Sequence, residues 1–404
     1  MLAFGEARQK VVEIVGARRR APAREVVELS EALDRVLAEQ VVADRDSPPF
    51  HRSTRDGFAV RASDLTVVPR TLEIIGEIKA GDTFTGQVSP GQCVQIMTGA
   101  AVPLGADAVV MFEHTKPSKS CAVVQRAVEV GENIVPKGSE AKTGQVLLEP
   151  GTRLSYAAVA LLAQVGHHRV GVARRPRVAI LSTGDEVVGV EENPGPFQIR
   201  NANSISLAAQ LRLCGAEPVA LGNSPDRVED LRPRIERGLE EDILVLSGGV
   251  SMGKYDLVGV VLRELGADFF FDGVAIRPGR PTVFGMCRDK FVFGLPGNPV
   301  STLVTFELFV LPAIDLLGGA LPRPLPFFKA KLAAPVRQKA PLTHFLPAEV
   351  SWPGGEPTVR ELRWQGSGDV VALAQANSFL VVPSNKLELE PGAWADVLPR
   401  RGVF

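Results

Sequence analysis

The sequence predicts a multidomain protein that combines a central α/β domain with domains built from β-strands. Its 404 residues exceed the usual size of one domain and suggest roughly two to four. Within residues 176–318, short apolar strands alternate with helical stretches, which predicts βαβ units and a mostly parallel sheet with helices on both faces. Residues 46–144 instead contain short β-branched runs separated by Gly, Pro, Asp and Asn, which is typical of a small all-β unit.

Helical spacing appears on both sides of this all-β unit. Near the N-terminus, apolar residues recur at helical spacing with charged residues between them, namely Ala7, Val11, Ile14 and Val15. A second helix is expected over residues 30–40, with Ser30 as its N-cap. Residues 152–165 return to helical spacing. The β unit is therefore predicted to be inserted between helical segments that pack together as one discontinuous domain.

The C-terminal part of the chain follows a proline-rich linker at residues 321–328. Beyond it, strands such as 328–334 and 379–383 are separated by Pro, Gly and Asn, which predicts a small β-barrel or sandwich. We therefore expect four domains. Their ranges are 1–45 with 145–175 (discontinuous helical domain), 46–144 (inserted β domain), 176–322 (central α/β domain) and 323–404 (C-terminal β domain).

Charge and cysteine content exclude several classes of protein. The chain has 45 Lys+Arg against 46 Asp+Glu, a net charge of -1, which argues against a general binder of nucleic acids or membrane surfaces. The four cysteines are far apart and form no CxxC pair: Cys93, Cys121, Cys214 and Cys287. We expect them to be buried thiols in a reducing compartment, not a disulfide framework or a zinc site.

The sequence predicts neither a secretory signal nor a membrane span. Residues 1–16 carry charges throughout and lack the apolar segment of a signal peptide. The longest apolar stretch, 300–317, contains Glu307, Pro312 and Asp315, so we expect a buried helix there. We therefore expect a soluble cytoplasmic protein without a nucleic-acid or membrane partner.

Two predicted strands of the central domain end in similar polar turns. One ends in Ser182, Thr183, Gly184, Asp185 and Glu186, and the other in Ser247, Gly248, Gly249 and Ser251. Glycines let backbone N–H groups approach an anion and hydroxyls add donors, so both turns suit a phosphate or another oxyanion. For one turn alone, a purely conformational role of the glycines is equally good, but two such turns in one sheet favour a ligand. Neither turn is a P-loop or a GxGxxG fingerprint.

Three acidic residues adjoin predicted strand ends: Glu186, Asp226 and Asp256. Ligands of open parallel sheets bind at the carboxyl ends of the strands. Three carboxylates converging near oxyanion donors there suggest a divalent cation between them and a phosphate. Each residue taken singly is better explained as a helix cap or first-turn acid.

Two further motifs carry groups suited to a phosphate-bearing ligand. Arg277 and Arg280 flank a Pro-Gly turn and suit an oxyanion, although surface salt bridges would explain either of them alone. The segment GLPGNPVS (294–301) fixes an unusual backbone through Pro296, Asn298 and Pro299, and a helix-entry turn explains it only in part.

Five motifs, taken together and in this order, resemble the molybdopterin molybdenumtransferase (MoeA) family, which includes the gephyrin E domain. They are STRDGFAV (53–60), IMTGAAVPLGADAVV (96–110), LSTGDE (181–186), LSGGVSMGKYD (246–256) and GLPGNPVS. The resemblance covers nearly the whole chain. It implies a discontinuous helical domain, an inserted β domain, a central α/β domain related to molybdopterin-binding proteins, and a C-terminal β-barrel. It also implies an elongated homodimer whose cleft lies between the central domain of one subunit and the inserted domain of the other.

The resemblance also implies an enzymatic reaction in molybdenum cofactor biosynthesis. Adenylyl-molybdopterin binds, its pyrophosphate bond is cleaved with Mg²⁺, and molybdate is inserted into the dithiolene with release of AMP. Molybdate and tungstate are nearly the same in size and charge, so the sequence does not distinguish them. A molybdopterin adenylyltransferase is a candidate partner, but the sequence does not name the protein that delivers the substrate.

The family's functional residues carry over by motif. The implied catalytic residues are Asp56 and Thr98 from the inserted domain, with Glu186, Asp226 and Asp256 as central-domain acids and metal ligands. The implied substrate-binding residues are Ser182, Gly184, Gly248, Gly249, Ser251, Arg277, Arg280, Pro296, Asn298, Pro299 and Ser367. The family usually has lysines at the two arginine positions, and Lys254 has no assigned role.

Several residues near the expected oxyanion site depart from the family pattern, and most of these departures reduce positive charge. Pro136 and Ser139 lie where the family is arginine-rich, with Lys137 and Glu140 as the nearest equivalents. The chain also has Arg55 in place of a usual methionine and Pro347 where a basic residue is common. These departures motivate a first alternative, a non-catalytic molybdopterin-binding paralogue or scaffold. A second alternative is a molybdopterin adenylyltransferase, although the inserted β domain and its DGFA motif favour metal insertion.

Overall fold

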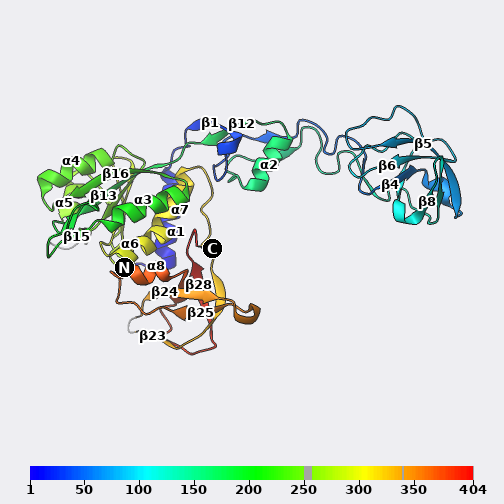
Figure 1. Cartoon of the computed structure of the whole chain (residues 1–404). Coiled ribbons are helices and arrows are strands. Elements are labelled where there is room, and N and C mark those ends of the chain that lie inside the picture. The colour runs from blue at the N-terminus through cyan, green and yellow to red at the C-terminus, as the bar shows by residue number, and fades with distance from the viewer. Residues whose placement is uncertain (250–256, 339–340, 404) are drawn as a thin grey trace. The chain divides into compact units, whose positions relative to one another are not determined.

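The computed structural model describes residues 1–249, 257–338 and 341–403, which form two compact units (Figure 1). Unit 1 consists of Met1–Val26, Asp34–Ala38 and Gly171–Phe404, and unit 2 of Val27–Leu33 and Glu39–Val170. The division is into two units, so the boundaries of the four expected domains stay predictions.

A six-stranded sheet forms the centre of unit 1 and confirms the predicted βαβ organisation. Its strand order is β16-β13-β17-β21-β20-β18. The strands are β13 (Arg177–Thr183), β16 (Glu217–Ser224), β17 (Ile243–Ser247), β18 (Asp268–Phe271), β20 (Val283–Cys287) and β21 (Lys290–Leu295). The first four strands in this order are parallel, and the last two add antiparallel pairs at one edge.

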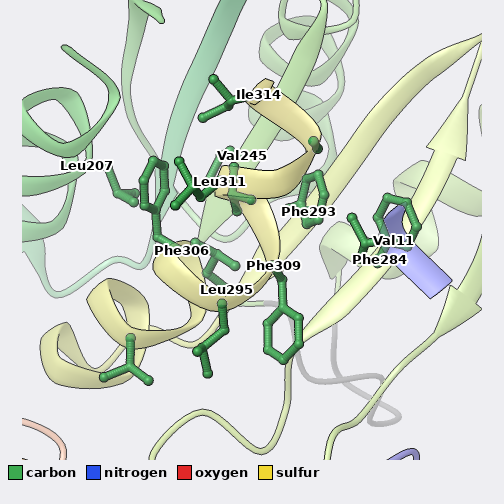
Figure 2. Packing of buried hydrophobic residues seen from close by; sticks show 14 of the residues in the cluster. Val11, Leu207, Val245, Phe284, Phe293, Leu295, Phe306, Phe309, Leu311 and Ile314 are labelled. Atoms are coloured by element: carbon green, nitrogen blue, oxygen red, sulfur yellow. The ribbon is translucent and has the colours of Figure 1, made fainter. Parts of the chain in front are cut away.

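Helices cover both faces of this sheet because successive strand residues point to opposite sides. On one face, Val178 and Ile180 of β13 belong to the same buried cluster as Leu207 of α3 (Ala202–Cys214). Figure 2 shows Leu207 with Val245 of β17 and Phe293 of β21 in this cluster. On the other face, Ala179 and Leu181 belong to a cluster with residues of α4 (Val228–Gly238) and α5 (Leu257–Glu264).

The apolar stretch expected to be a buried helix is a helix in three parts. These are α6 (Pro299–Thr305), the π-helical turn η4 (Phe306–Val310) and α7 (Leu311–Leu317). Among the described residues, Pro299–Leu317 is the one helix long and apolar enough to cross a membrane, but 83% of its apolar window is buried inside the structure. Its apolar side chains, Phe306 and Phe309 included, pack in the cluster of Figure 2.

The N-terminal helix α1 (Phe4–Arg18) supplies a hydrogen-bond donor that the long helix lacks at Pro312. Pro312 has no N–H to donate to the carbonyl of Leu308, four residues earlier. The Arg8 guanidinium donates to that carbonyl instead, at 2.6 Å, and also to the carbonyl of Arg323. Helix α1 therefore packs on the central core of unit 1.

The C-terminal strands of unit 1 form a closed barrel, which resolves the choice between barrel and sandwich. The order is β24-β25-β22-β28-β26, and β26 pairs with β24 to close it. Their bounds are β22 (Phe328–Leu332), β24 (Thr343–Ser351), β25 (Thr358–Glu361), β26 (Ser378–Val382) and β28 (Trp394–Pro399). Strand β19 (Ile276–Arg277) joins β24, and α8 (Val370–Gln375) begins at Asp369, whose carboxylate accepts from the N–H of Ala372.

Unit 2 contains a second six-stranded sheet, ordered β7-β4-β6-β5-β9-β8. The strands are β4 (Gly57–Val60), β5 (Arg70–Ile78), β6 (Gln92–Ile96), β7 (Ala108–Met111), β8 (Thr115–Pro117) and β9 (Cys121–Val124). Helix α2 (Tyr156–Gln164) lies within the predicted range 152–165, and Ser155 caps it by accepting from the N–H of Ala158. This sheet confirms the β-strand character predicted for residues 46–144.

The remaining elements are short. Two-stranded pairs are β1 (Arg24–Glu28) with β12 (Arg169–Ala173), β2 (Val41–Val42) with β11 (Val146–Leu148), β3 (Arg52–Ser53) with β10 (Ile134–Val135), β14 (Val187–Val188) with β15 (Ile199–Arg200), and β23 (Val336–Arg337) with β27 (Glu388–Leu389). The 3₁₀ turns are η1 (Leu29–Glu31), η2 (Ala62–Leu65), η3 (Phe112–His114) and η5 (Pro353–Gly355).

The helix expected over residues 30–40 is wrong. Only η1 is helical there, and Ser30 lies inside it without acting as an N-cap. Asp34 adopts a left-handed φ of 61°, Leu37 forms a bridge with Val172, and the N–H of Ala38 donates to the carbonyl of Gly171. Pairing with a distant strand has therefore overridden the local helical propensity.

Candidate functional site

A cavity of about 440 Å³ lies at the carboxyl ends of the parallel strands of unit 1. This volume is in the range typical of small-molecule sites. It is lined by residues that follow strands β13, β16, β17 and β21 and by the start of α3: Ser182, Thr183, Gly184, Glu186, Asn201, Asn203, Asp226, Ser247, Gly248, Gly249, Pro281, Pro296, Gly297, Asn298 and Pro299, among others.

The sheet register explains why segments far apart in sequence meet here. Ser182 at the end of β13 is opposite Ser247 at the end of β17, and Ser247 is opposite Leu295 at the end of β21. The turns that follow these three parallel strands therefore leave the sheet at one edge. The structure thus brings together both predicted polar turns and the Pro296–Pro299 turn.

Close packing between the turns requires glycine at two positions. Gly248 has a φ of 90° and Gly249 a φ of 58°, both left-handed. A Cβ on Gly248 would lie 2.7 Å from the carbonyl oxygen of Thr183, and one on Gly249 would lie 2.5 Å from its Oγ1. The glycines are therefore needed both for the turn and for the approach of Thr183.

Backbone hydrogen bonds limit which glycine N–H groups can serve a ligand. The N–H of Gly184 donates to the carbonyl of Ser224, and the N–H of Gly248 donates to the carbonyl of Leu295. Of the three predicted glycines, Gly249 is thus the one whose N–H we expect to meet an anion. Ser251, Lys254 and Asp256 lie outside the described residues.

Two buried polar atoms at the cavity lack a hydrogen-bond partner within the described part of the chain: Oγ1 of Thr183 and Oδ1 of Asn203. The amide nitrogen of Asn203 donates to Ser247 Oγ at 2.8 Å and to the carbonyl of Gly297 at 2.7 Å. These two bonds fix the amide and leave its oxygen as an acceptor. Since buried polar groups are normally satisfied, both atoms indicate a ligand or water in the cavity.

Asn203 is a site residue that the sequence did not reveal. It lies within the first turn of α3, in a stretch predicted simply as helix, and it reaches the cavity because α3 starts beside the ends of β13 and β17. Nearby, the hydroxyl of Ser182 is bonded to Oδ1 of Asn201 at 3.1 Å and to Oγ of Ser204 at 2.8 Å. The Ser182 hydroxyl is therefore already engaged with the N-terminal turn of α3, a position that favours anions.

The acidic side of the cavity is formed by Glu186 and Asp226. Burial, followed by the negative charges of Asp185 and Glu186, raises the pKa of Asp226 above its usual range. The N–H of Asp226 donates to the Asp185 carboxylate at 3.2 Å. Among the residues that the structure describes, no group of three His, Cys, Asp or Glu side chains is arranged to hold a metal ion.

The Pro296–Pro299 turn is held from two sides. The amide nitrogen of Asn298 donates to the hydroxyl of Ser367 at 2.8 Å, and the carbonyl of Ser367 accepts from the N–H of Val300. The hydroxyl of Thr302 donates to the carbonyl of Pro296 at 2.5 Å. Ser367, predicted from the C-terminal region, thus contacts the cavity wall through this turn.

The two predicted arginines are not part of the cavity lining. Arg277 and Arg280 are exposed, and it is Pro281, the next residue, that lines the cavity. Their assignment to substrate therefore stays a prediction.

Unit 2 holds the remaining predicted catalytic residues as a hydrogen-bonded pair. The backbone N–H and the hydroxyl of Thr98 both donate to Oδ1 of Asp56, each at 2.7 Å. These bonds, the backbone one first, lower the pKa of Asp56 below its usual range. Both side chains are exposed, as expected of residues that meet a ligand or a partner.

In unit 2, the nearest equivalents of the family's charged residues in the arginine-rich stretch form surface pairs. Lys137 lies 3.7 Å from Asp46, and Glu140 pairs with Arg52 at 3.2 Å. Exposed pairs of this kind contribute little to stability.

Three family models together match most of the chain. Residues 2–166 match the MoeA N-terminal region (domain I and II), residues 179–316 match a probable molybdopterin binding domain, and residues 329–399 match the MoeA C-terminal region (domain IV).

Known proteins resemble the chain over nearly its full length. The molybdopterin molybdenumtransferase of Bacillus subtilis is 38% identical over 384 residues, which cover 93% of this chain and 89% of that protein. The molybdopterin molybdenumtransferase of Staphylococcus aureus is 33% identical over 97% of this chain and 94% of its own. A crystal structure of the molybdopterin biosynthesis MoeA protein from Pyrococcus horikoshii OT3 has a TM-score of 0.83 at 30% identity, covering 99% of this chain and 100% of that one. The chain belongs to the MoeA family, whose members among these relatives are named molybdopterin molybdenumtransferase.

Proposed function

We propose that the protein is a molybdopterin molybdenumtransferase of molybdenum cofactor biosynthesis, which inserts molybdate into adenylyl-molybdopterin and releases AMP. The observation that carries this proposal is the convergence of the family's central-domain motifs on one cavity at the carboxyl ends of the sheet. The cavity offers hydrogen-bonding groups without partners in the described part of the chain beside two carboxylates, as a phosphorylated pterin with a bound cation requires.

The chain's own groups would bind and orient the substrate. The N–H of Gly249 and the hydroxyl of Thr183 are suited to donate to phosphate oxygens, because both belong to residues that line the cavity at a turn without side-chain bulk. The amide oxygen of Asn203, fixed by its two donated bonds, is suited to accept from an N–H of the substrate. Cleavage of the pyrophosphate bond consumes one water and gives AMP and molybdopterin, which keeps the other phosphate.

The acids of the cavity fit a divalent cation. Burial first, and then the negative charges of Asp185 and Glu186, raise the pKa of Asp226, and a bound positive charge would counteract this. We propose that Glu186 and Asp226 hold Mg²⁺ together with Asp256, which lies outside the described residues. When bound, the ion would neutralise charge on the pyrophosphate and on the departing AMP.

We further propose that Asp56 and Thr98 complete the active site across a homodimer. Their exposed, hydrogen-bonded arrangement supports a role in contacting substrate held by a second subunit. The four cysteines are all free thiols, which supports a reducing, cytoplasmic location. We propose a molybdopterin adenylyltransferase as a candidate partner.

Neither alternative is favoured. A molybdopterin adenylyltransferase would need only the central domain, yet residues 2–166 and 329–399 also match MoeA regions. A scaffold without catalysis would have no need for repelling acids in a cavity, but Glu186 and Asp226 are both there.

The test is to supply purified protein with adenylyl-molybdopterin, molybdate and Mg²⁺ and, separately, with molybdopterin and ATP. The proposal predicts AMP release and molybdenum-loaded cofactor in the first reaction and no adenylylation in the second. Adenylylation without metal insertion would assign the protein to the transferase that precedes it, and binding without either reaction would assign it to the scaffold.

A further inference from the structure

The turn formed by residues 184–187 carries Glu186 at the candidate site. Gly184 and Glu186 both line the cavity. The carboxylate of Glu186 lies over Gly184, because a Cβ added to Gly184 would be 2.6 Å from Oε2 of Glu186. Gly184 also has a left-handed φ of 135°. Glycine at this position therefore leaves room for the place that the Glu186 carboxylate occupies.

Asn223, in strand β16, bonds to this turn on both sides of Glu186. Its amide nitrogen donates to the carbonyl of Gly184 and to the carbonyl of Val187, both at 3.0 Å. These two carbonyls precede and follow Glu186 in the chain. One amide group therefore fixes the backbone before and after the acid.

The backbone bonds of the turn are longer than those that Asn223 makes. The N–H of Gly184 donates to the carbonyl of Ser224 at 3.2 Å, and the N–H of Val187 donates to the carbonyl of Gly184 at 3.3 Å. Typical N–H···O bonds are about 2.9–3.0 Å long. The two bonds from Asn223 are thus a substantial part of what holds the turn against the end of β16.

A break in the strand register aims Asn223 at the turn. Strands β13 and β16 pair in parallel, with Ile180 opposite Ala220 but Ser182 opposite Asn223. Strand β16 therefore has one residue more than β13 between these pairs, which is a β-bulge. Because side chains alternate between the two faces of a strand, an extra residue changes the direction in which Asn223 points.

The amide oxygen of Asn223 indicates that this residue does more than stabilise the fold. Its Oδ1 is buried and has no hydrogen-bond partner in residues 1–249, 257–338 and 341–403. Burying an acceptor without a partner costs free energy, and a leucine of similar length would avoid that cost. The asparagine is therefore best explained by the two bonds that its nitrogen donates.

We propose that Asn223 is a positioning residue for Glu186 and, through it, for the divalent cation of the reaction. The inference rests on the proposed function, in which Glu186 and Asp226 hold Mg²⁺. Asn223 does not line the cavity, so it acts through the turn and not by contact with substrate. Asp226 follows the end of β16, so an amide that holds the turn against this strand sets the separation of the two carboxylates.

A fixed separation of the carboxylates should strengthen cation binding. A turn that could move would have to be ordered when the ion binds, and the cost of that ordering would lower the affinity. Asn223→Leu removes both donated bonds and keeps the approximate length of the side chain. We expect this variant to bind Mn²⁺ about 10-fold more weakly or worse, the usual effect of losing a residue that orients metal ligands.

The test is titration of the full-length protein with Mn²⁺, with the free ion measured by electron paramagnetic resonance and stability measured by chemical denaturation. Asn377→Leu is a matched control, because Asn377 also bonds to backbone groups, those of Val350, but in the C-terminal barrel and outside the cavity lining. The control should lose stability and keep the wild-type Mn²⁺ affinity. The same pattern in Asn223→Leu would assign Asn223 a purely structural role and overturn the proposal.

The wild type separates this inference from the proposed function. No saturable Mn²⁺ binding by the wild type would refute the metal site itself, and the inference with it. Wild-type binding that Asp226→Asn weakens and Asn223→Leu leaves unchanged would refute the inference alone.

A second variant decides if Asn223→Leu does not fold. In Asn223→Asp, the new carboxylate adds a negative charge near the cation site but repels the carbonyls of Gly184 and Val187. Charge alone predicts tighter Mn²⁺ binding, whereas loss of positioning predicts weaker binding. We expect weaker binding, and unchanged or tighter binding by a folded Asn223→Asp protein would contradict the proposal.

Discussion

Replacing Gly249 with alanine tests whether the turn after β17 is a phosphate cradle or only a turn. The new Cβ would lie 2.5 Å from Oγ1 of Thr183, a contact shorter than real Cβ atoms make. The change therefore places a methyl group between the two turns that line the cavity. We expect substrate binding to be lost while the protein still folds.

The structure allows both costs to be estimated. A residue with a side chain at φ 58° costs about 1–2 kcal/mol, and the overlap with Thr183 costs about 1–3 kcal/mol more. Typical domains are stable by about 5–15 kcal/mol, so the variant should remain folded. Losing one charge-assisted hydrogen bond to the Gly249 N–H costs about 1.5–3 kcal/mol, which corresponds to roughly 10- to 150-fold in affinity.

Equilibrium binding of molybdopterin, with chemical denaturation of the same samples, is the appropriate assay. Gly222→Ala is a matched control, because Gly222 also has a left-handed φ, of 80°, but lies outside the cavity lining, and a Cβ added to it would meet no atom within 4 Å. The control should lose about 1–2 kcal/mol of stability and keep its affinity. Unchanged affinity in a folded Gly249→Ala protein would refute the cradle.

Three further predictions concern other parts of the chain. Thr98→Val removes one of the two donors to Asp56, so the pKa of Asp56 should rise toward its usual value in an NMR titration. Because the pKa of Asp56 is lowered in the folded protein, the stabilisation from the Thr98–Asp56 hydrogen bonds should be complete above the usual pKa and should be lost as the pH falls through the lowered pKa. An unchanged pKa of Asp56 in the variant would contradict this. Arg8→Met leaves the Leu308 carbonyl without its donor and should cost about 1–3 kcal/mol in chemical denaturation, whereas wild-type stability would show that the bond is dispensable. Mixing Asp56→Ala subunits with Asp226→Ala subunits should restore part of the activity through one intact site per heterodimer, and heterodimers as inactive as their parents would exclude sharing between subunits.

The sequence was most informative where a strand is buried on both faces. Residues 177–183 and 243–247 are nearly continuous apolar runs ending in Ser-Thr-Gly or Ser-Gly-Gly, so strand and turn could both be recognised. Because the strands are parallel neighbours, the polar turns had to meet, and they do. Glu186 and Asp226 follow from the same reasoning.

Other features depend on contacts between residues distant in sequence and left no local signal. Asn203 lies at the cavity through its hydrogen bonds to Ser247 and Gly297. These contacts can be predicted only when the order of the strands in the sheet is known. Residues 30–40 have helical propensity, but Leu37 pairs with Val172 instead. The sequence around Arg8 is that of an ordinary helix, and it gives no sign that Arg8 donates to the carbonyl of Leu308, which Pro312 cannot reach with an N–H.

The central claim is that the cavity acids promote cleavage of adenylyl-molybdopterin, and AMP release by wild type and Asp226→Asn tests it most directly. The substitution keeps the shape of the side chain, removes a charge that Asp185 and Glu186 repel, and should therefore not destabilise the fold. Asp230→Asn, on α4 and outside the cavity lining, is the control. With molybdate and Mg²⁺ present, we predict AMP release by the wild type and the control, and release slower by on the order of a hundredfold or more in Asp226→Asn with molybdopterin binding nearly intact. Full-speed release by Asp226→Asn, or wild-type release undiminished by excess chelator, would contradict the account.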